Sequence, residues 1–272
     1  MKLFITDFDG TLGTTDKKIT PATREALDRW CAAGNLFVLS SGRALMNIRE
    51  IAEQLGLNYP GMLIVGYNGS EVYDCGKGEL IFHRGIPMEL IPVIFRLAKE
   101  TGLYIQTYND THILCEHLSD ELTYYNTWVH LPHLVADNIM DLVEKDPCKC
   151  LAITQHHTEL LPVLRDKILA AFPGVVNAYQ SSEYLLEIVT ADVDKGTSLQ
   201  FLCDYFHIPV SDTIAAGDAP NDIPMLKAAG LGIVMKNGAE IYPEMREAGQ
   251  QPGCVITEED NDHDGLVPYL QV

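Results

Sequence analysis

Short apolar segments alternate with amphipathic ones along the first part of the chain, and this alternation restricts the possible folds more than any other feature. The apolar segments 3–6, 36–39 and 62–65 are too short for helices and have no polar face. Between them, apolar residues recur at helical spacing, and each run ends at a glycine, Gly34 or Gly56. Strands that are apolar on both faces are typical of a parallel sheet covered by helices on both sides. The sequence therefore predicts an α/β fold.

The pattern changes in the middle of the chain. Between residues 83 and 189, short strands are mixed with helices, and Asn109-Asp110 predicts a hairpin between strands 104–108 and 112–115. Asn68-Gly69 predicts another hairpin further upstream. Parallel α/β patterning returns from residue 195. We therefore expect a Rossmann-like parallel-sheet core domain, built from residues 1–82 plus 190–272, and an inserted α+β domain at residues 83–189.

The first predicted strand ends in an acidic turn, Asp7-Phe8-Asp9-Gly10-Thr11-Leu12. In extended backbone, two aspartates at i and i+2 point to the same side, and Gly10 then lets the chain turn away. Two carboxylates at the carboxyl end of a strand suit a bound Mg²⁺ and a phosphate. The Asp-x-Asp-Gly pattern alone also begins many calcium loops and ordinary turns, so its interpretation depends on other segments.

Three further segments share the same character. Strand 36–39 leads into Ser40-Ser41-Gly42-Arg43, Asp194-Lys195-Gly196 precedes an amphipathic stretch, and strand 213–216 leads into Gly217-Asp218-Ala219-Pro220-Asn221-Asp222. Together with the acidic turn, and in this order, they resemble the four signatures of the haloacid-dehalogenase-like hydrolases. The last segment resembles the corresponding block of the Cof-type subfamily. Because open parallel sheets bind ligands at the carboxyl ends of their strands, we expect the four segments to converge there.

This resemblance spans Asp7 to Leu226 and implies a function. Its members are mostly Mg²⁺-dependent phosphatases that work through an aspartyl-phosphate. We therefore expect a phosphomonoesterase that takes a small-molecule phosphate ester as substrate: a sugar phosphate, a nucleotide or a phosphorylated cofactor. The position of the insert implies the larger α/β cap of the Cof-type branch, a specificity domain that closes over the substrate.

The resemblance also implies roles for individual residues. Asp7 is expected to be the nucleophile, and Asp9 the general acid and then the base, with a pKa nearer neutrality than the ~3.9 of free aspartate. Asp7, the backbone carbonyl of Asp9, and Asp218 would ligate Mg²⁺, whose preferred ligands are hard oxygens. Asp222 would hold metal-bound waters. Lys195 would offset the negative charge of the phosphate and the nucleophile.

A second group of residues is expected to bind the phosphate. The Ser41 hydroxyl and the Gly42 amide would bind phosphate oxygens, and Asn221 would orient the phosphate or the side chain of Asp7. Arg43 would touch the phosphate or brace the start of the next helix. The full phosphate-binding set is Phe8, Ser41, Gly42, Arg43, Lys195 and Asn221.

Composition limits the partners. The chain has 38 acidic and 19 basic residues, a formal net charge of −19, which argues against nucleic acid or an anionic membrane surface as partner. We expect no membrane span and no signal peptide, because Asp7 interrupts the first apolar run. Seven cysteines, an odd number without a regular framework, indicate reduced thiols. We therefore expect a cytoplasmic protein. The sequence does not indicate its oligomeric state.

Two other functions are compatible with the same motifs. A phosphomutase-like enzyme would pass the phosphoryl group to another sugar hydroxyl instead of water and would need a bisphosphate activator. A non-catalytic phosphosugar-binding module would share the fold, since fold alone does not determine function. The joint presence of Asp7, Asp9, Lys195 and Asp218 favours an enzyme, because a binding module needs neither a nucleophile nor an acid.

One acidic segment lies outside the four signatures. Residues Asp260–Gly265 match the first half of a calcium-binding loop, but the twelfth position is Gln271, which cannot supply the bidentate carboxylate. We expect a solvated acidic loop that leads into a last helix.

The insert is rich in imidazole and aromatic side chains. We hypothesise that His112, His117, Tyr108, Tyr124 and Trp128 face the leaving group when the cap is closed. This hypothesis rests only on the density of such residues in the segment.

Overall fold

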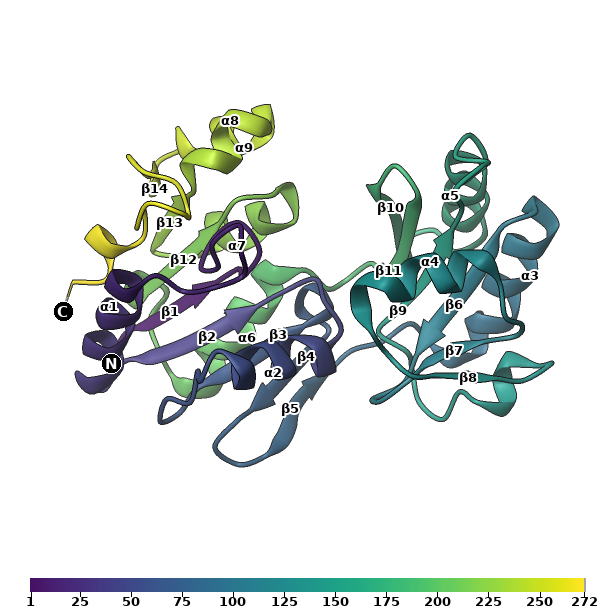
Figure 1. Ribbon diagram of the computed structural model, residues 1–272, viewed down its shortest axis with the longest axis horizontal. Helices are drawn as coiled ribbons and strands as arrows, with labels where there is room; N and C mark the ends of the chain where they lie inside the picture. The colour runs from purple at the N-terminus through teal and green to yellow at the C-terminus, as the bar shows by residue number, and fades with distance from the viewer. Residues whose placement is uncertain (272) are drawn as a thin grey trace. The chain divides into compact units, whose positions relative to one another are not determined.

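The computed structural model describes residues 1–271 and divides into two compact units (Figure 1). The first unit comprises Met1–His83 together with the segment from Val193 onward, and the second comprises Arg84–Asp192. The chain thus leaves the first unit, builds the second, and returns. None of the helices within residues 1–271 combines the length and the apolar character that crossing a membrane requires.

The first unit is built on a sheet with the strand order β14-β13-β12-β1-β2-β3-β4-β5. All neighbouring strands from β14 to β3 are parallel, and β4 and β5 extend the sheet in antiparallel pairing. The strands are β1 Leu3–Thr6, β2 Leu36–Ser40, β3 Leu63–Gly66, β4 Glu71–Asp74, β5 Glu79–His83, β12 Thr213–Gly217, β13 Leu231–Val234 and β14 Cys254–Ile256.

Helices connect these strands. The α-helices of the first unit are α1 Pro21–Ala32, α2 Leu45–Gln54, α6 Lys195–Phe206, α7 Ile223–Ala228, α8 Lys236–Ile241 and α9 Pro243–Gly249. Short 3-10 turns occur at Tyr67–Gly69, Val210–Asp212, Pro220–Asp222 and Val267–Tyr269.

The central strand β1 is buried on both faces, as its apolar sequence predicts. Leu3 and Ile5 belong to the core cluster that also contains residues of α6, α7 and α9. Phe4 points to the opposite face, where its ring lies 6.1 Å from that of Trp30 in α1. The indole of Trp30 donates a hydrogen bond of 2.9 Å to the carbonyl of Leu36, so the buried ring is also satisfied as a donor. Helices therefore cover both faces of the sheet.

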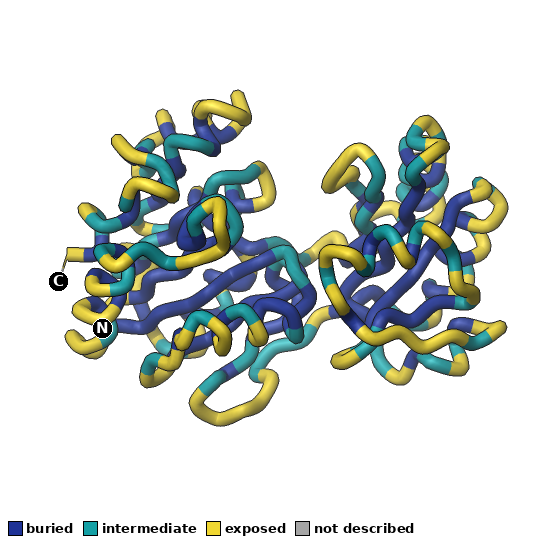
Figure 2. Tube along the Cα trace, in the orientation of Figure 1, coloured by how far each residue is buried: buried dark blue, intermediate teal, exposed yellow. Residues whose placement is uncertain are grey.

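The second unit contains a six-stranded sheet in the order β10-β11-β9-β6-β7-β8, antiparallel except for the pair β7 and β8. Helices α3 and α5 pack on one face, where the apolar core of this unit lies. In Figure 2 the central strands of each unit are buried, whereas most connections are exposed. The elements are α3 Ile91–Thr101, β6 Tyr104–Tyr108, β7 Ile113–Cys115, α4 Asp120–Val129, β8 His133–Val135, β9 Lys149–Ile153, α5 Leu160–Ala171, β10 Val176–Ser182 and β11 Leu185–Thr190, with 3-10 turns at Met88–Leu90 and Ile139–Asp141.

The predicted fold class is confirmed: a mixed α/β protein with a parallel-sheet core and an additional sheet. The two predicted hairpins are present, between β3 and β4 and between β6 and β7. Two helices are preceded by 3-10 turns, Met88–Leu90 before α3 and Pro220–Asp222 before α7, and each of these helices has a proline in its first turn. The backbone N–H groups of a helix's first turn have no partner within the helix, so a proline, which lacks this group, is tolerated there.

Candidate active site

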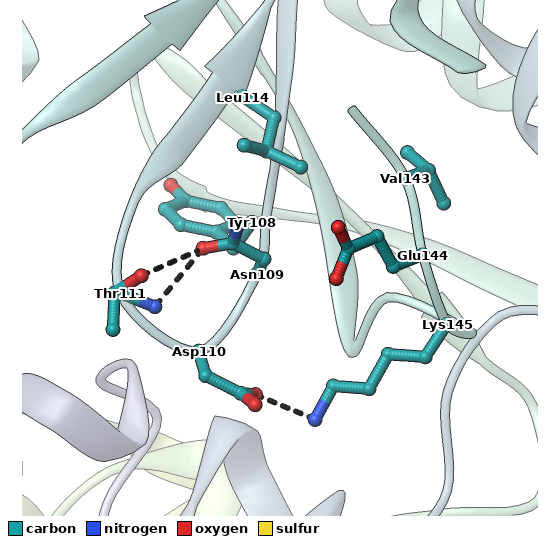
Figure 3. Close-up of a pocket in the computed structure, with 8 residues that line it drawn as sticks. All are labelled: Tyr108, Asn109, Asp110, Thr111, Leu114, Val143, Glu144 and Lys145. Atoms are coloured by element: carbon teal, nitrogen blue, oxygen red, sulfur yellow. Dashed lines mark hydrogen bonds and ion pairs between the residues drawn. The ribbon is translucent and has the colours of Figure 1, made fainter. Parts of the chain in front are cut away.

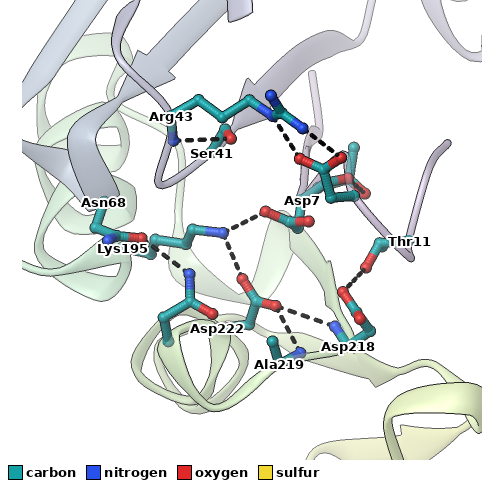
Figure 4. Close-up of polar contacts among 12 residues, drawn as sticks. Asp7, Thr11, Ser41, Arg43, Asn68, Lys195, Asp218, Ala219 and Asp222 are labelled. Carbon is teal, nitrogen blue, oxygen red and sulfur yellow. Dashed lines mark hydrogen bonds and ion pairs between the residues drawn. The ribbon is translucent and has the colours of Figure 1, made fainter. Parts of the chain in front are cut away.

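The four signature segments meet at the carboxyl ends of the central strands of the first unit's sheet (Figure 4). Strand β1 pairs with β2 on one side and β12 on the other, so the carboxyl ends of these three strands are neighbours. Asp7 follows β1 directly, Ser41 follows β2, and Asp218 follows β12. Lys195 is the first residue of α6.

Lys195 lies at the centre of the polar cluster. Its ammonium nitrogen lies 2.6 Å from Oδ1 of Asp7 and 2.6 Å from Oδ1 of Asp222. Its side chain is fully buried. The second oxygen of Asp222 accepts hydrogen bonds of 3.0 Å from the backbone amides of Asp218 and Ala219. Asp222 therefore both holds Lys195 and shapes the turn that presents Asp218.

The start of α6 explains the position of Lys195. Asp194 caps the helix by accepting from the Thr197 amide, and the Thr197 hydroxyl accepts from the Asp194 amide in return, which completes a capping box. Gly196 lets the helix approach closely, since a Cβ there would lie 2.7 Å from the carbonyl oxygen of Pro224. The capping box and this close contact together fix Lys195 beside the carboxyl ends of the central strands.

The charges of this cluster shift one another's pKa. Burial, followed by repulsion from Asp222 and Asp218, raises the pKa of Asp7 well above its usual value, although Lys195 opposes the shift. Burial and the charge of Asp222 raise the pKa of Asp218 to about 6. Burial alone would lower the pKa of Lys195, but Asp222 and Asp7 raise it, so it remains a cation. Three carboxylates thus share one buried positive charge.

Asp9 differs from the expectation. Its carboxylate accepts from Nε and Nη2 of Arg43 at 2.7 and 3.0 Å, and Lys17 Nζ lies 2.5 Å from the same side chain. Partial burial opposes the effect, but these two cations lower the pKa of Asp9 below its ordinary value. The expected shift toward neutrality is therefore wrong for this state of the site. Its cause is the pairing with Arg43 and Lys17, which stabilises the charged form.

The acidic residues suit a divalent metal ion. Asp7, Asp218 and Asp222 each offer a carboxylate oxygen, and these oxygens lie within 4.8 Å of one another. Gly10 keeps the space beside Asp218 open, because a Cβ there would lie 2.4 Å from Asp218 Oδ2. The hydroxyl of Thr11 donates a hydrogen bond of 2.8 Å to the other oxygen of Asp218. Hard oxygen donors and unrelieved negative charge fit Mg²⁺.

The predicted phosphate-binding residues lie around this cluster. Ser41 is buried, and its hydroxyl oxygen accepts from the Arg43 amide at 3.1 Å. A Cβ on Gly42 would come within 3.0 Å of the Asn68 side chain. The Phe8 side chain is fully buried in the core, so only its backbone is available for a ligand.

Asn221 contacts a different residue from those expected. Its amide donates 2.9 Å to the Asn68 side chain, and Asn221 itself is exposed. Arg43 pairs with Asp9, an interaction that was not among the two anticipated for it. Arg43 therefore connects the loops that follow β1 and β2, and Asn221 connects those that follow β3 and β12.

The comparison with known families agrees with this geometry. A family model described as haloacid dehalogenase-like hydrolase matches residues 4–267. The chain belongs to this family. The expected resemblance, including its Cof-type character, is thereby confirmed, and the chain is a hydrolase.

Named relatives and solved structures align along most of the hydrolase. An HMP-PP phosphatase of Yersinia pseudotuberculosis is 29% identical over 89% of this chain and 85% of its own length. A 5-amino-6-(5-phospho-D-ribitylamino)uracil phosphatase of Bacillus subtilis is 25% identical over 99% of this chain and 96% of its own. The crystal structure of a haloacid dehalogenase-like hydrolase from Bacteroides thetaiotaomicron matches with a TM-score of 0.86 and 29% identity, covering 99% of this chain and 98% of that one.

Sequence reasoning missed two contacts of the site in this hydrolase. Lys17 reaches Asp9 from a loop that carries no signature, and Thr11 binds Asp218 from within the first signature. Thr11 could have been found from its place in the acidic turn. Lys17 could not, because most lysines are solvated and its position depends on the path of the loop.

The imidazole and aromatic residues of the second unit are placed as follows. Tyr108 is buried in a chain of hydrogen bonds that joins Tyr104, Gln106, Tyr108 and Tyr125. The rings of Tyr124 and Trp128 pack 4.6 Å apart, and Trp128 is half exposed. The hypothesis that such residues face a leaving group stays a prediction.

The second unit of the hydrolase also has a pocket of its own (Figure 3). Its volume is about 440 Å³. Lys145 Nζ lies 2.5 Å from Asp110 Oδ1 at its rim, so the two charges neutralise each other. The residues that line it are Tyr108, Asn109, Asp110, Thr111, Leu114, Val143, Glu144 and Lys145. Tyr108, which we hypothesised to face a leaving group, is among them, whereas none of the predicted catalytic, phosphate-binding or metal-ligating residues is.

Proposed function

We propose that this hydrolase is a Mg²⁺-dependent phosphomonoesterase that acts on small phosphorylated metabolites through an aspartyl-phosphate on Asp7. One observation carries the proposal: the Asp7 carboxylate is held by the buried ammonium of Lys195, beside carboxylate oxygens of Asp218 and Asp222. This is the arrangement that a carboxylate nucleophile needs to approach a phosphate dianion, because a cation must offset the repulsion between them.

Asp7 would act as the nucleophile. One of its oxygens is fixed by Lys195, which leaves the other to attack phosphorus. The new bond joins an Asp7 oxygen to phosphorus as the bond to the leaving alkoxide breaks. Water then attacks the same phosphorus and releases inorganic phosphate and the free carboxylate. Mg²⁺ held by Asp7, Asp218 and the carbonyl of Asp9 would supply positive charge against the phosphate oxygens.

Asp9 would move the protons, giving one to the leaving alkoxide and taking one from the attacking water. With Arg43 and Lys17 on its oxygens, Asp9 is held as the carboxylate, the form that accepts the proton from water. A phosphate dianion bound beside Arg43 competes for this cation, and weaker pairing raises the pKa of Asp9 toward the acid form. Asp9 is thus suited to both steps in turn.

The substrate is proposed from chemistry and from the relatives. The negative charge of the chain excludes large polyanions as preferred ligands, whereas a single phosphate group is matched by Lys195 and Arg43. The relatives from Yersinia pseudotuberculosis and Bacillus subtilis carry names of phosphatases with small metabolite substrates. We propose a substrate of this class, with residues 83–189 as the cap that reads its leaving group.

Phosphate release from a panel of phosphorylated metabolites tests the proposal. Release is expected with Mg²⁺, is lost in EDTA, and falls by at least about 10³-fold in Asp7→Asn. Asp137→Asn, an exposed aspartate of the second unit, serves as the matched control and keeps full activity. An active Asp7→Asn variant would contradict the aspartyl-phosphate. Turnover only with a bisphosphate activator would indicate phosphomutase-like transfer instead.

A further inference from the structure

A loop with no signature carries one of the two cations on Asp9. Residues 13–20, here called the Lys17 loop, connect the acidic turn to α1. The loop closes on itself, since the Thr14 amide donates 2.8 Å to the carbonyl of Lys18 and the Lys17 amide donates 2.8 Å to that of Thr14. At its tip, Lys17 Nζ lies 2.5 Å from Asp9 Oδ1.

The backbone of Lys17 is in an unusual conformation. Its φ of +60° lies in the left-handed region, which costs a residue with a side chain roughly 1–2 kcal/mol. Such conformations persist only where surrounding contacts impose them, and they cluster at functional sites. Lys17 itself is exposed, so packing of its own side chain does not impose this conformation. Contacts elsewhere in the loop must do so.

The acidic loop, Asp260–Gly265, supplies those contacts. Asp262 accepts from both the amide and the hydroxyl of Thr15, at 2.8 and 2.7 Å, one on each carboxylate oxygen. Asn261 donates 2.9 Å to the carbonyl of Gly13. The Lys17 loop is held in this way at three separate places, because Asp264 also accepts from the hydroxyl of Thr20 at the loop's end.

The acidic loop has a defined shape of its own. Asp260 accepts from the Asp262 amide at 2.9 Å, and its carbonyl accepts from the Gly265 amide at 3.0 Å. Gly265 is required there, because a Cβ would lie 2.2 Å from the carbonyl oxygen of Glu259. The expectation of a merely solvated loop is therefore wrong, since three of its side chains bind another segment, and a 3-10 turn rather than a longer helix follows it.

We propose that the acidic loop is a positioning element for the reaction, which holds the Lys17 loop so that Lys17 orients the carboxyl group of Asp9. The inference rests on the proposed function, since it assigns Asp9 the transfer of protons. Arg43 binds both carboxylate oxygens of Asp9. Lys17 adds a second cation on Oδ1, and the two cations together fix the direction in which the carboxyl oxygens face a leaving group or water. Asp262 and Thr15 act through Lys17 and touch no reacting atom.

The dependence of the rate on the leaving group separates this role from a merely structural one. An alkyl phosphate needs a proton on its leaving oxygen, whereas 4-nitrophenyl phosphate leaves without one. In Lys17→Met, Thr15→Val and Asp262→Asn, we expect kcat/KM on an alkyl phosphate, which reports the transfer of the phosphoryl group to Asp7, to fall at least about tenfold, a fraction of what a placed acid contributes. On 4-nitrophenyl phosphate, we expect kcat/KM to change by less than about threefold, because that transfer needs no acid.

The chain offers matched controls for each variant. Lys18→Met removes the neighbouring exposed lysine, Glu258→Gln removes an exposed carboxylate close in sequence to the acidic loop, and Thr15→Ser keeps the hydroxyl. All three are expected to behave as wild type on both esters. Equal losses on both esters, or no loss on either, would overturn the inference. A wild-type protein that hydrolyses neither ester would instead count against the proposed function.

Limited proteolysis tests, independently of enzyme activity, whether the acidic loop restrains the Lys17 loop. Trypsin cleaves after Lys17 and Lys18, and a loop held at three places resists it. We expect Asp262→Asn and Thr15→Val to raise the initial rate of this cleavage at least about fivefold, because local opening of the loop becomes easier. Glu258→Gln should leave the rate unchanged. An unchanged rate in Asp262→Asn would show that the acidic loop does not hold the Lys17 loop.

Discussion

The ammonium group of Lys195 lies 2.6 Å from the carboxylate of Asp7, although 188 positions separate the two residues. Both side chains are buried, and the contact joins the segment before the inserted unit to the segment after it. A buried ion pair of this kind contributes little net stability, but the loss of one partner leaves an uncompensated charge. The pair is therefore expected to matter for both folding and reaction.

Lys195→Met is expected to destabilise the protein and to remove most activity. Asp7 and Asp222 would remain buried without their shared cation, at a cost of about 3–5 kcal/mol in the free energy of unfolding. Activity should fall at least about 10²-fold, because the charge on the nucleophile and phosphate is no longer offset. Urea denaturation and phosphate release measure the two effects. Lys227→Met, an exposed lysine, is the control, and an equal loss in that variant would contradict the prediction.

Gly10→Ala is expected to weaken Mg²⁺ binding through Asp218. Gly10 has a φ of +80°, and a Cβ there would lie 2.4 Å from Asp218 Oδ2. Gly34 has a φ of +79° with nothing within 4 Å of the added Cβ, so Gly34→Ala carries the same backbone strain without the clash. This strain should cost each variant roughly 1–2 kcal/mol of stability. Only Gly10→Ala should raise the Kd for Mg²⁺, by about tenfold or ~1.4 kcal/mol, as measured by calorimetry. Equal affinities in the two variants would refute it.

Asp218 is expected to make the metal-free protein less stable as the pH rises. Burial and Asp222 raise its pKa from 3.8 to about 6 in the folded state. The folded state thus holds this proton more tightly than the unfolded state. The stability that the bound proton contributes is therefore fully present below pH 3.8 and is lost as the pH rises through about 6. In EDTA, Asp218→Asn should therefore gain about 1–3 kcal/mol over wild type between about pH 4 and 7.

Saturating Mg²⁺ should reverse this ranking near neutral pH. The metal stabilises wild type by binding the folded state, whereas Asp218→Asn has lost a ligand and gains little. Urea denaturation at about pH 4 and pH 7, with and without Mg²⁺, measures the difference in stability between wild type and Asp218→Asn under each of the four conditions. A stability gap between the two proteins that is independent of pH would contradict the assignment of the repulsion to Asp218.

Much of the fold was predictable because its strands are buried on both faces. The runs at β1, β2 and β3 are apolar at nearly every position, which leaves few alternatives to a covered parallel sheet. Helix α4 was missed, although Ser119 caps it and its first turn is acidic, because only Leu122 and Tyr125 on it are buried and its apolar periodicity is weak. Strand β8 was missed because all its residues are exposed. Tertiary context, rather than local pattern, determines both.

The site shows the same division between local and distant causes. Asp7, Lys195 and Asp218 come together because each stands at the end of a central strand or the start of an adjoining helix, and the alternating pattern predicts the parallel sheet that carries them. The pairing of Lys17 with Asp9 depends on a left-handed backbone and on hydrogen bonds to a segment 247 residues away, between Thr15 and Asp262. Neither the left-handed backbone nor the distant hydrogen bonds can be predicted from periodicity in the sequence. Catalytic roles for these residues stay predictions until variants are measured.

The strand order has a consequence for how the protein is made on the ribosome. Strand β1 is synthesised well before its neighbour in the sheet, β12, which begins only at Thr213. At ~5–20 residues per second, one edge of the nascent β1 waits roughly 10–40 s for that partner, while the whole of Arg84–Asp192 emerges and can fold. An unpaired apolar edge invites pairing with other chains. We therefore expect the nascent first unit to be the part most prone to such pairing during translation.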